Sequence, residues 1–335
     1  MSNMNKYLLS LLSMLMVCFN ASATEEGALN GTFTINGSGD KVQFSQGNLQ
    51  YQASTGTWRF AENQWDIIGA ANSNISSTYS GWIDLFGWAT SGWESGCGNN
   101  AYQPYSTSTN PSDFSLHDLW FVYNMTGDYA NADWGVYNAI SNGGNAAGLW
   151  RTLNFNELNY LFNTRKNATN LRSQVAVNGV CGYAILPDEF ILPDGISFIA
   201  MAEDWTTNVY DTTAWRQMEA AGAVFLPAAG CRVNENKINF INERGYYWTS
   251  SVQNGVLKRI IFIHGANSTL LYHMQANIGL SVRLVQTHIP DANPTAIENT
   301  LAGQTQPATQ KILRDGQIVI LRGDKEYTLT GQEVK

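Results

Sequence analysis

Three short blocks late in the chain decide its fold: Phe-Leu-Pro-Ala-Ala-Gly-Cys-Arg at 225–232, Gly-Tyr-Tyr-Trp-Thr-Ser-Ser at 245–251 and Gly-Leu-Ser-Val-Arg-Leu-Val at 279–285. Their apolar runs, bounded by glycines, predict short strands. The segment between the last two blocks mixes polar, basic and aromatic side chains without a clear period. Regular pieces around an irregular filling indicate a scaffold that presents a surface.

Residues 1–23 form a targeting segment at the start of the chain. Lys6 supplies a positive charge, the run from Tyr7 to Phe19 is apolar apart from two serines, and Ala-Ser-Ala at 21–23 offers small residues for cleavage. The apolar run is shorter than the ~20 residues that a membrane-spanning helix requires. We therefore expect export and removal of this segment.

The chain is acidic and sparsely charged. Its formal net charge is −8, only 14% of its residues are charged, and Lys and Arg together number 19. This balance excludes the basic footprint that nucleic-acid binding requires. The abundance of Asn, Ser, Thr, Gly and aromatic residues is typical of a β-rich protein outside the cytoplasm. After the targeting segment no stretch is apolar enough to predict a transmembrane helix.

The four cysteines bear on export and on cross-linking. Cys18 raises a lipoprotein signal as an alternative, although Val17 precedes it where a small residue is usual. Cys97, Cys181 and Cys231 follow the targeting segment, and an odd number permits at most one internal disulfide. One bridge and buried free thiols both stay open.

The first half of the chain predicts strands followed by loops. Residues 70–150 are rich in Asn, Ser, Gly and Tyr with little periodicity, which indicates long surface loops. Before them, alternating apolar runs predict strands at Thr32–Ile35, Lys41–Phe44, Leu49–Gln52 and Thr57–Phe60.

Two helices are expected in the second half. Asn154 and Glu157 form a capping-box pattern for a helix over Phe155–Arg165, and Asp211 caps another over Thr212–Ala221. Further strands are expected at Cys181–Leu186, Phe190–Leu192, Ala223–Leu226, Tyr246–Thr249, Val256–His264 and Leu280–Val285. Two helices among many short strands predict an α+β domain.

Composition divides the mature chain into three parts. Residues 24–289 form the main domain. Residues 290–310 carry three prolines and almost no large apolar side chains, which indicates a flexible linker. Residues 311–335 predict a small β tail of three strands, with turns at Asp-Gly 315–316 and Gly-Asp 323–324.

The main domain contains seven short segments of distinctive composition. They are Val42–Tyr51, Gly81–Trp88, Trp150–Leu153, Glu157–Phe162, Leu186–Asp188, Gly245–Ser251 and Ser281–Val285. Together they resemble secreted bacterial proteins of the C-type-lectin-like fold, in the branch shared with formylglycine-generating enzymes and the major paralogous surface domains. The resemblance covers roughly residues 30–287. It implies that the region between the last two segments builds the ligand-facing surface, which in some relatives is diversified by a retroelement.

The tail carries a second resemblance. Leu313–Lys335, at the C-terminus and after a linker, resembles the sorting module of type IX secretion cargo. This implies export machinery as a partner and the outer surface of a gram-negative bacterium, or the medium, as the destination. A short capping hairpin is the alternative.

The chemistry of the related enzymes is not expected here. Formylglycine-generating enzymes use cysteines late in the fold, but Gly279–Val285 contains Ser281 and no cysteine. The calcium-dependent sugar site of the lectin branch needs acidic residues, which Gln-Pro-Tyr at 103–105 and Trp-Thr-Ser at 248–250 lack. We therefore expect no catalytic residue, no metal and no cofactor.

Other side chains have a functional and a structural interpretation. Asp188 and Asp194 each follow a proline, where Asp commonly caps a turn. With Glu203 they are also the candidate carboxylates of a carbohydrate-active enzyme. His264 and His273 would face one another if their segments form a hairpin, although two histidines alone make a weak metal site.

Three Gly-Trp pairs offer aromatic faces. Exposed Trp82, Trp88 or Trp93 side chains would stack on sugar rings. The apolar neighbours of Trp82 and Trp88 favour core packing for those two, whereas Trp93 is expected to be more exposed.

The leading hypothesis is a secreted or surface-displayed, non-enzymatic binding protein, adhesin-like, with a glycan or protein ligand. Tyr, Asn and Ser are side chains of adaptable binding surfaces, although an ordinary solvated hairpin is an alternative. A carbohydrate-active enzyme and a structural component of a surface assembly are the other functions considered. The ligand site is expected at Trp248, Lys258, Arg259, His264, Asn267, Tyr272, His273, Gln275 and Asn277.

Overall fold

The computed structural model of the chain divides into two compact units, Met1–His288 and Ile289–Lys335. In the second unit it describes only the backbone of four strands. In the first unit it describes residues 26–94, 99–114, 124–234, 237–253, 256–265 and 272–288. The expected targeting segment, Cys97, Asn267 and most of the expected linker lie outside the described residues.

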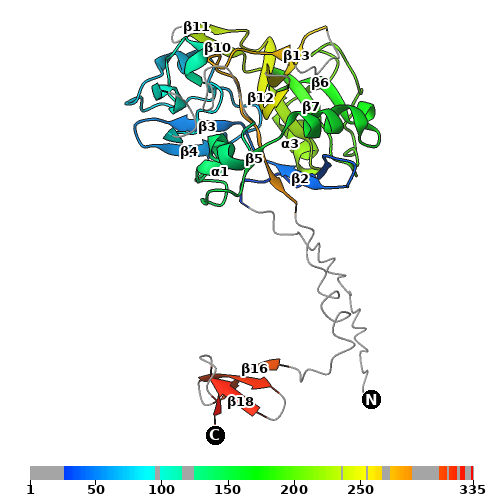
Figure 1. The fold of residues 1–335 in the computed structure, drawn as a ribbon. Helices are drawn as coiled ribbons and strands as arrows, with labels where there is room; N and C mark the ends of the chain where they lie inside the picture. Colours follow the sequence, from blue (N-terminus) through cyan, green and yellow to red (C-terminus); the bar gives the residue numbers. More distant parts are fainter. Residues whose placement is uncertain are drawn as a thin grey trace, which may run out of the picture. The chain divides into compact units, whose positions relative to one another are not determined.

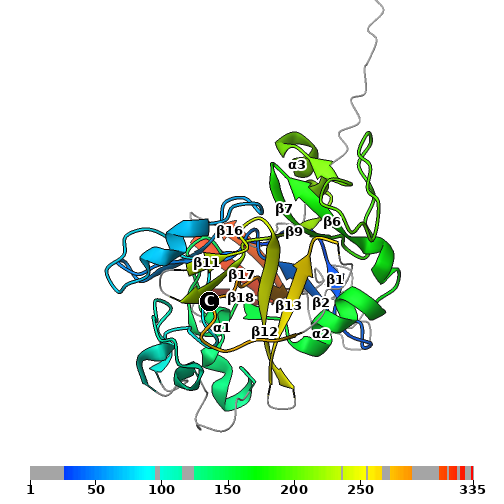
Figure 2. The ribbon, with the colours of Figure 1, turned by 90° about the horizontal axis from the view of Figure 1, so that it is seen from above.

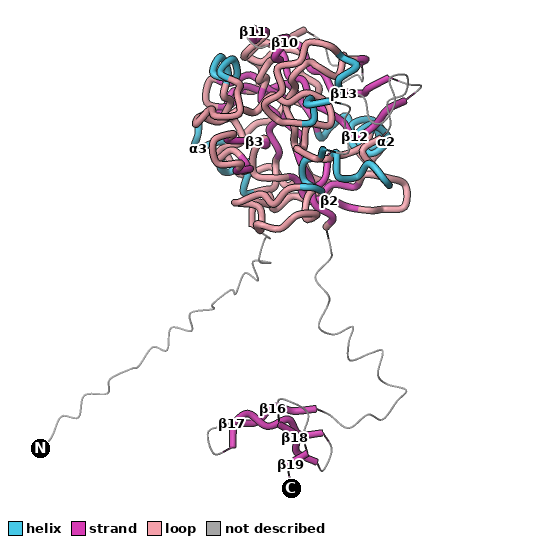
Figure 3. The backbone as a smooth tube through the Cα atoms, turned by 60° about the vertical axis from the view of Figure 1, so that its left-hand side comes forward, coloured by secondary structure: helices cyan, strands magenta, loops and turns pink. Residues whose placement is uncertain are grey.

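The first unit is an α+β domain in which several small sheets are joined by loops, drawn in pink in Figure 3. One antiparallel sheet has the order β1-β2-β15-β5. It therefore joins strands from the start, the middle and the end of the first unit's sequence. A separate hairpin pairs β3 with β4. The strands are β1 (Phe33–Thr34), β2 (Lys41–Phe44), β15 (Leu284–Thr287), β5 (Arg151–Thr152), β3 (Leu49–Gln52) and β4 (Thr57–Phe60). The four strands expected in this first part of the chain are confirmed.

A second sheet has the order β8-β6-β7-β9, and β8 runs parallel to β6. Its strands are β8 (Val209–Tyr210), β6 (Arg172–Val177), β7 (Val180–Ile185) and β9 (Val224–Pro227). β6 was not expected, because its first three residues are polar and yet buried, which hides the alternation. The strand expected at Phe190–Leu192 is wrong: this stretch is a loop, and its Ile191 side chain is 81% exposed.

A third sheet, in the order β12-β13-β14, lies in the middle of the unit, with β3 and β4 on one side and β6, β7 and α3 on the other (Figure 1). A short hairpin of β10 and β11 precedes it in the chain. These strands are β12 (Arg244–Gln253), β13 (Val256–Ile263), β14 (Tyr272–His273), β10 (Cys231–Asn234) and β11 (Lys237–Asn239).

Both expected helices form, and the shorter α1 (Trp134–Tyr137) adds a third. α2 (Phe155–Asn159) begins with the expected capping box between Asn154 and Glu157. Its second half differs from expectation, because Tyr160–Thr164 forms a π-helical turn, η6. α3 (Thr212–Ala220) begins at the expected Asp211 cap. Short 3₁₀ helices are η1 (Gly69–Asn74), η3 (Asn99–Tyr102), η4 (Pro111–Phe114), η5 (Gly127–Ala132) and η7 (Ala168–Leu171).

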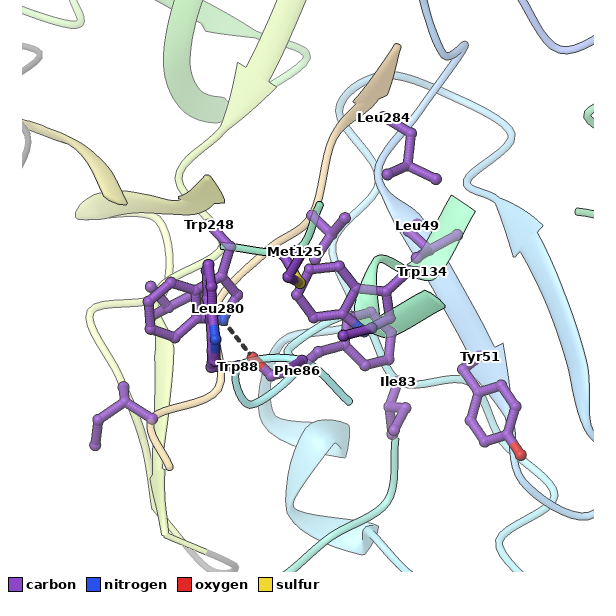
Figure 4. Close-up of a cluster of buried hydrophobic side chains, with 14 of the residues drawn as sticks. Leu49, Tyr51, Ile83, Phe86, Trp88, Met125, Trp134, Trp248, Leu280 and Leu284 are labelled. Atoms are coloured by element: carbon purple, nitrogen blue, oxygen red, sulfur yellow. Dashed lines mark hydrogen bonds between the residues drawn. The ribbon is translucent and has the colours of Figure 1, made fainter. Parts of the chain in front are cut away.

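The expectation of surface loops over residues 70–150 is wrong in one respect. The segment has little regular structure, but it contributes many of the large aromatic side chains of the core. Phe86, Trp88 and Trp134 are fully buried and pack beside Trp248 and Leu280 in the close-up of Figure 4. These loops are therefore held by packing and form an integral part of the fold.

The third sheet separates two core clusters. Tyr246, Trp248 and Ile261 belong to one cluster, whereas Tyr247 and Phe262 belong to the other. Neighbouring residues of a strand point to opposite faces, so β12 and β13 contribute to both clusters. A third cluster lies around Trp215 and Phe225, between α3 and the second sheet.

A buried polar network connects these elements. Arg283 is 5% exposed, its Nη2 donates to Oε1 of Gln64 at 2.9 Å, and its Nη1 donates to Oδ1 of Asn48 at 3.5 Å. Gln64 Oε1 also accepts from the backbone N–H of Phe225, and its Nε2 donates to the carbonyl of Ala223. Burial lowers the pKa of Arg283 to about 10, so it stays charged at neutral pH.

Two buried carboxylates, those of Asp84 and Asp133, hold neighbouring segments together through hydrogen bonds. Asp84 accepts from the backbone N–H of Ile68 and from Nδ2 of Asn72. Asp133 accepts from the backbone and hydroxyl of Thr152. Burial raises the pKa of Asp84 and of Asp133 to about 6 despite these hydrogen bonds.

The second unit is a four-stranded antiparallel sheet in chain order. Its strands are β16 (Thr309–Arg314), β17 (Gln317–Arg322), β18 (Lys325–Thr328) and β19 (Glu333–Val334). It has one strand more than expected, and β16 begins inside the stretch expected to be linker. Among the described residues of both units, no helix combines the length and the apolarity needed to cross a membrane.

Gln64→Leu should lower the free energy of unfolding by about 4 kcal/mol, because it leaves Arg283 charged, buried and short of an acceptor. The double variant Gln64→Leu/Arg283→Met should recover more than about 1 kcal/mol of that loss. Chemical denaturation measures both. Gln217→Leu, on the exposed face of α3, is the matched control and should change stability by less than about 0.5 kcal/mol. A Gln64→Leu variant as stable as the control would contradict this account.

Stability should fall as pH rises through about 6, because the two buried carboxyls must then ionise in the folded state. Their pKa is raised from 3.8, so their contribution is fully present below pH 3.8 and is lost above pH 6. The change is about 3 kcal/mol for each carboxyl. The free energy of unfolding of Asp84→Asn, measured at several pH values, should depend less on pH than that of the unchanged protein. Asp128→Asn, at an exposed carboxyl, should have the same pH dependence as the unchanged protein. Identical profiles for all three proteins would show that ionisation of Asp84 does not contribute.

Candidate functional site

The third sheet brings several of the expected site residues into two neighbouring rows. Arg259 of β13 pairs with Trp248 of β12 on one side and with Tyr272 of β14 on the other. In the next row, Lys258 pairs with His273. The expected site therefore has a common backbone frame, although its side chains differ in position.

Trp248 is wrong as a ligand-contacting residue. Its side chain is 2% exposed, and its Nε1 donates to the carbonyl of Phe86 at 2.7 Å, the dashed line in Figure 4. Its ring meets that of Trp88 edge to face at 5.3 Å between centroids. Trp248 is therefore part of the core beneath the surface.

Arg259 is buried without a counter-charge. Only 8% of it is exposed, and its guanidinium carbon lies 4.8 Å from the centroid of the Tyr246 ring. Within the described residues its Nε and Nη1 have no hydrogen-bond partner and no carboxylate forms an ion pair with it. Burial lowers the pKa of Arg259, and the nearby charge of Arg244 lowers it further.

The surroundings of Arg259 add a second cation and a thiol. Arg244 stacks on the ring of Phe240 at 3.9 Å, and its Nη1 donates to the hydroxyl of Tyr246 at 3.4 Å. Burial raises the pKa of Cys231 to about 11, so its thiol is protonated and neutral at physiological pH. We call Arg244, Tyr246, Arg259 and Cys231 the Arg259 cluster.

Sequence reasoning missed Arg244, Tyr246 and Cys231 as members of this cluster. A signal was available, because Arg244, Tyr246 and Trp248 are spaced by two along one strand and so share a face. Cys231 comes from another strand, β10, and no local pattern connects it to Arg259.

The remaining expected residues are spread apart. His264 is exposed, with Nε2 3.4 Å from Oδ1 of Asp204, and it does not face His273, which pairs with Lys258 six positions away. Asn277 is buried and its Nδ2 donates to the carbonyl of Thr109, which makes it a wrong candidate for an exposed contact. Gln275 is exposed, and Asn267 lies outside the described residues.

Asp188 has a structural role. It accepts hydrogen bonds from Nη1 of Arg165 at 2.9 Å and from the hydroxyl and backbone N–H of Thr34. The carboxylate therefore ties the first sheet to the segment after η6, which is more than the turn cap expected from its position. Asp194 and Glu203 lie on exposed loops. Among the described residues, no three His, Cys, Asp or Glu side chains gather as a metal site requires.

The Gly-Trp pairs are engaged within the fold. Trp88 is fully buried, as expected, whereas Trp82 is half-buried with the guanidinium of Arg59 3.8 Å above its ring. Trp93 is half-buried and packs against the first core cluster, so it is less exposed than expected. Cys181 and Cys231 are both free thiols and are not joined to each other.

No protein-family model, curated protein or solved structure matches this chain.

Proposed function

We propose that this chain is an exported, non-enzymatic binding protein on a C-type-lectin-like scaffold, and that its ligand presents an acidic group to Arg259. The observation that carries the proposal is the buried guanidinium of Arg259, whose Nε and Nη1 have no hydrogen-bond partner among the described residues. The α+β architecture and the targeting segment agree with the scaffold and with export.

An unpaired guanidinium inside a protein is costly. Charged groups removed from water normally have both an opposite charge and hydrogen-bond acceptors. Arg259 has neither at Nε and Nη1 within the described residues, and Arg244 repels it. Nε and Nη1 are both shielded from solvent, so binding requires a local displacement, after which an oxygen of a ligand carboxylate or sulfate accepts from one of these N–H groups.

The ligand class follows from this chemistry. Acidic glycans, such as those containing uronate or sulfated sugars, and acidic side chains of a partner protein carry suitable groups. The chain itself is acidic, with a formal charge of −8, so long-range attraction does not bring such a ligand to the surface. Recognition depends on short-range contacts within the Arg259 cluster.

Arg259→Gln should weaken binding while leaving the fold intact. On an array of acidic and neutral glycans, the mature full chain should bind the acidic glycans. The affinity of the variant for these glycans should be lower by at least about tenfold. Because the substitution removes an uncompensated buried charge, the free energy of unfolding should stay level or rise by about 1 kcal/mol.

Lys166→Gln is the matched control for the loss of one positive charge, since Lys166 is exposed and distant in the chain from β13. It should bind as the unchanged protein does. Selection of neutral glycans only, or full binding by Arg259→Gln, would refute the role of Arg259. If no glycan binds, a pull-down of surface proteins with the unchanged chain, Arg259→Gln and Lys166→Gln tests whether the ligand is an acidic protein.

The tail is proposed to direct export through a type IX secretion system. It forms a sheet within its own unit, beginning at Thr309, and it follows the proline-containing segment. Deleting residues 309–335 should leave the protein inside the cell envelope, as measured by immunoblotting of cell fractions. Unfolding of the purified truncated protein should match that of the full chain. Normal secretion of the truncated protein would exclude this role.

A further inference from the structure

We propose that a polar cavity between α2 and the end of β12 is a second ligand site, which takes an uncharged, hydroxyl-rich group such as one sugar ring. α2 lies beside the hairpin of β12 and β13 (Figure 2) and contacts β12, and a cavity of about 210 Å³ is lined by residues from the start of α2 and the end of β12. It is lined by Asn124, Thr126, Asn154, Phe155, Asn156, Ser251 and Val252. This site is independent of the Arg259 cluster.

A bulge in β12 directs Ser251 to this cavity. Trp248 pairs with Arg259 and Val252 pairs with Leu257, so four steps along β12 match two steps along β13. The two extra residues leave the pairing with β13 and bond elsewhere: the backbone N–H of Ser250 donates to the carbonyl of Leu153. Bulges commonly re-aim a side chain next to a functional site.

The lining offers hydrogen-bonding groups that are still available. The hydroxyl oxygen of Ser251 accepts from the backbone N–H of Phe155 at 2.9 Å, which leaves its own hydrogen to donate. Asn124 accepts from the N–H of Val252 through Oδ1, which leaves its Nδ2 as a donor. Thr126 and Asn156 are exposed, and their side chains make no hydrogen bond within the described residues.

The cavity is not suited to an ion. None of its lining residues is charged, and the nearby Arg151 and Glu157 are paired with each other at 2.8 Å. The backbone N–H of Glu157 is already bonded to Asn154, and that of Phe155 to Ser251. Carboxamides and hydroxyls both donate and accept, as the hydroxyls of a neutral sugar do.

Size and rigidity set the kind of occupant. Pockets for drug-sized ligands measure roughly 300–1,000 Å³, so a cavity of about 210 Å³ fits a single ring better than an extended ligand. The capping box of α2 and the bond between Asn124 and Val252 hold the walls in place before a ligand arrives. A preformed site lowers the ordering cost of binding.

The test is a titration of the isotope-labelled, mature full chain with a panel of neutral monosaccharides, followed by NMR. A binding sugar should give saturable shifts at the Asn124 and Asn156 side-chain amides. Thr126→Val/Asn156→Ala removes two partners and should weaken affinity by about tenfold. Thr126→Trp fills the cavity and should prevent binding.

Asn170→Ala, at an exposed asparagine of η7, is the control and should bind like the unchanged protein. Melting temperatures confirm that each variant is folded. The proposal is overturned if no neutral sugar gives saturable shifts, or if both cavity variants bind normally. Binding of acidic sugars alone, lost in Arg259→Gln, would overturn this site and leave the proposed function in place.

Discussion

The fold depends on the hydrogen bonds that Arg283 makes inside the core. Its guanidinium reaches Gln64 and Asn48, and Gln64 in turn bonds to the backbone on both sides of Val224. These contacts join the residue that precedes β15, the loop after β4 and the second sheet, which are far apart in the sequence. A charge in this place is tolerated only when its acceptors are in position, so the network also specifies how the elements pack.

Arg283 and Arg259 are two buried guanidinium groups that differ in their hydrogen-bond partners. Neither has an ion pair with an acid in the described part of the chain. Nη1 and Nη2 of Arg283 donate to neutral oxygen acceptors and only its Nε has no partner in the described part of the chain, whereas Arg259 lacks partners at both Nε and Nη1 there. Proteins retain such local deficits chiefly where a ligand completes them, and this contrast is the physical basis for assigning Arg259 to binding.

The sequence predicted features that depend on a few adjacent residues. The capping box at Asn154 and the helix at Asp211 are of this kind, and both are present. Prediction from the sequence failed where tertiary contacts determine which side chains are buried. The polar start of β6 is buried by its neighbours, and the Phe190–Leu192 run is exposed because nothing covers its apolar side chains. Trp248 and Arg259 are adjacent across two strands, but the packing of distant loops buries Trp248, and Nε and Nη1 of Arg259 have no partner among the described residues.

The bulge in β12 divides the strand into two parts with different surroundings, one for each of the two proposed sites. Up to Trp248, the strand is held between two core clusters, and its alternate side chains are fixed by packing on both faces. Beyond Trp248, the extra residues turn away from β13 and bond to the segments around Met125 and Leu153. The chain can therefore change the side chains near Ser251 without disturbing the register that positions Arg259. The bulge thus separates the residues of the first proposed site from those of the second along one strand.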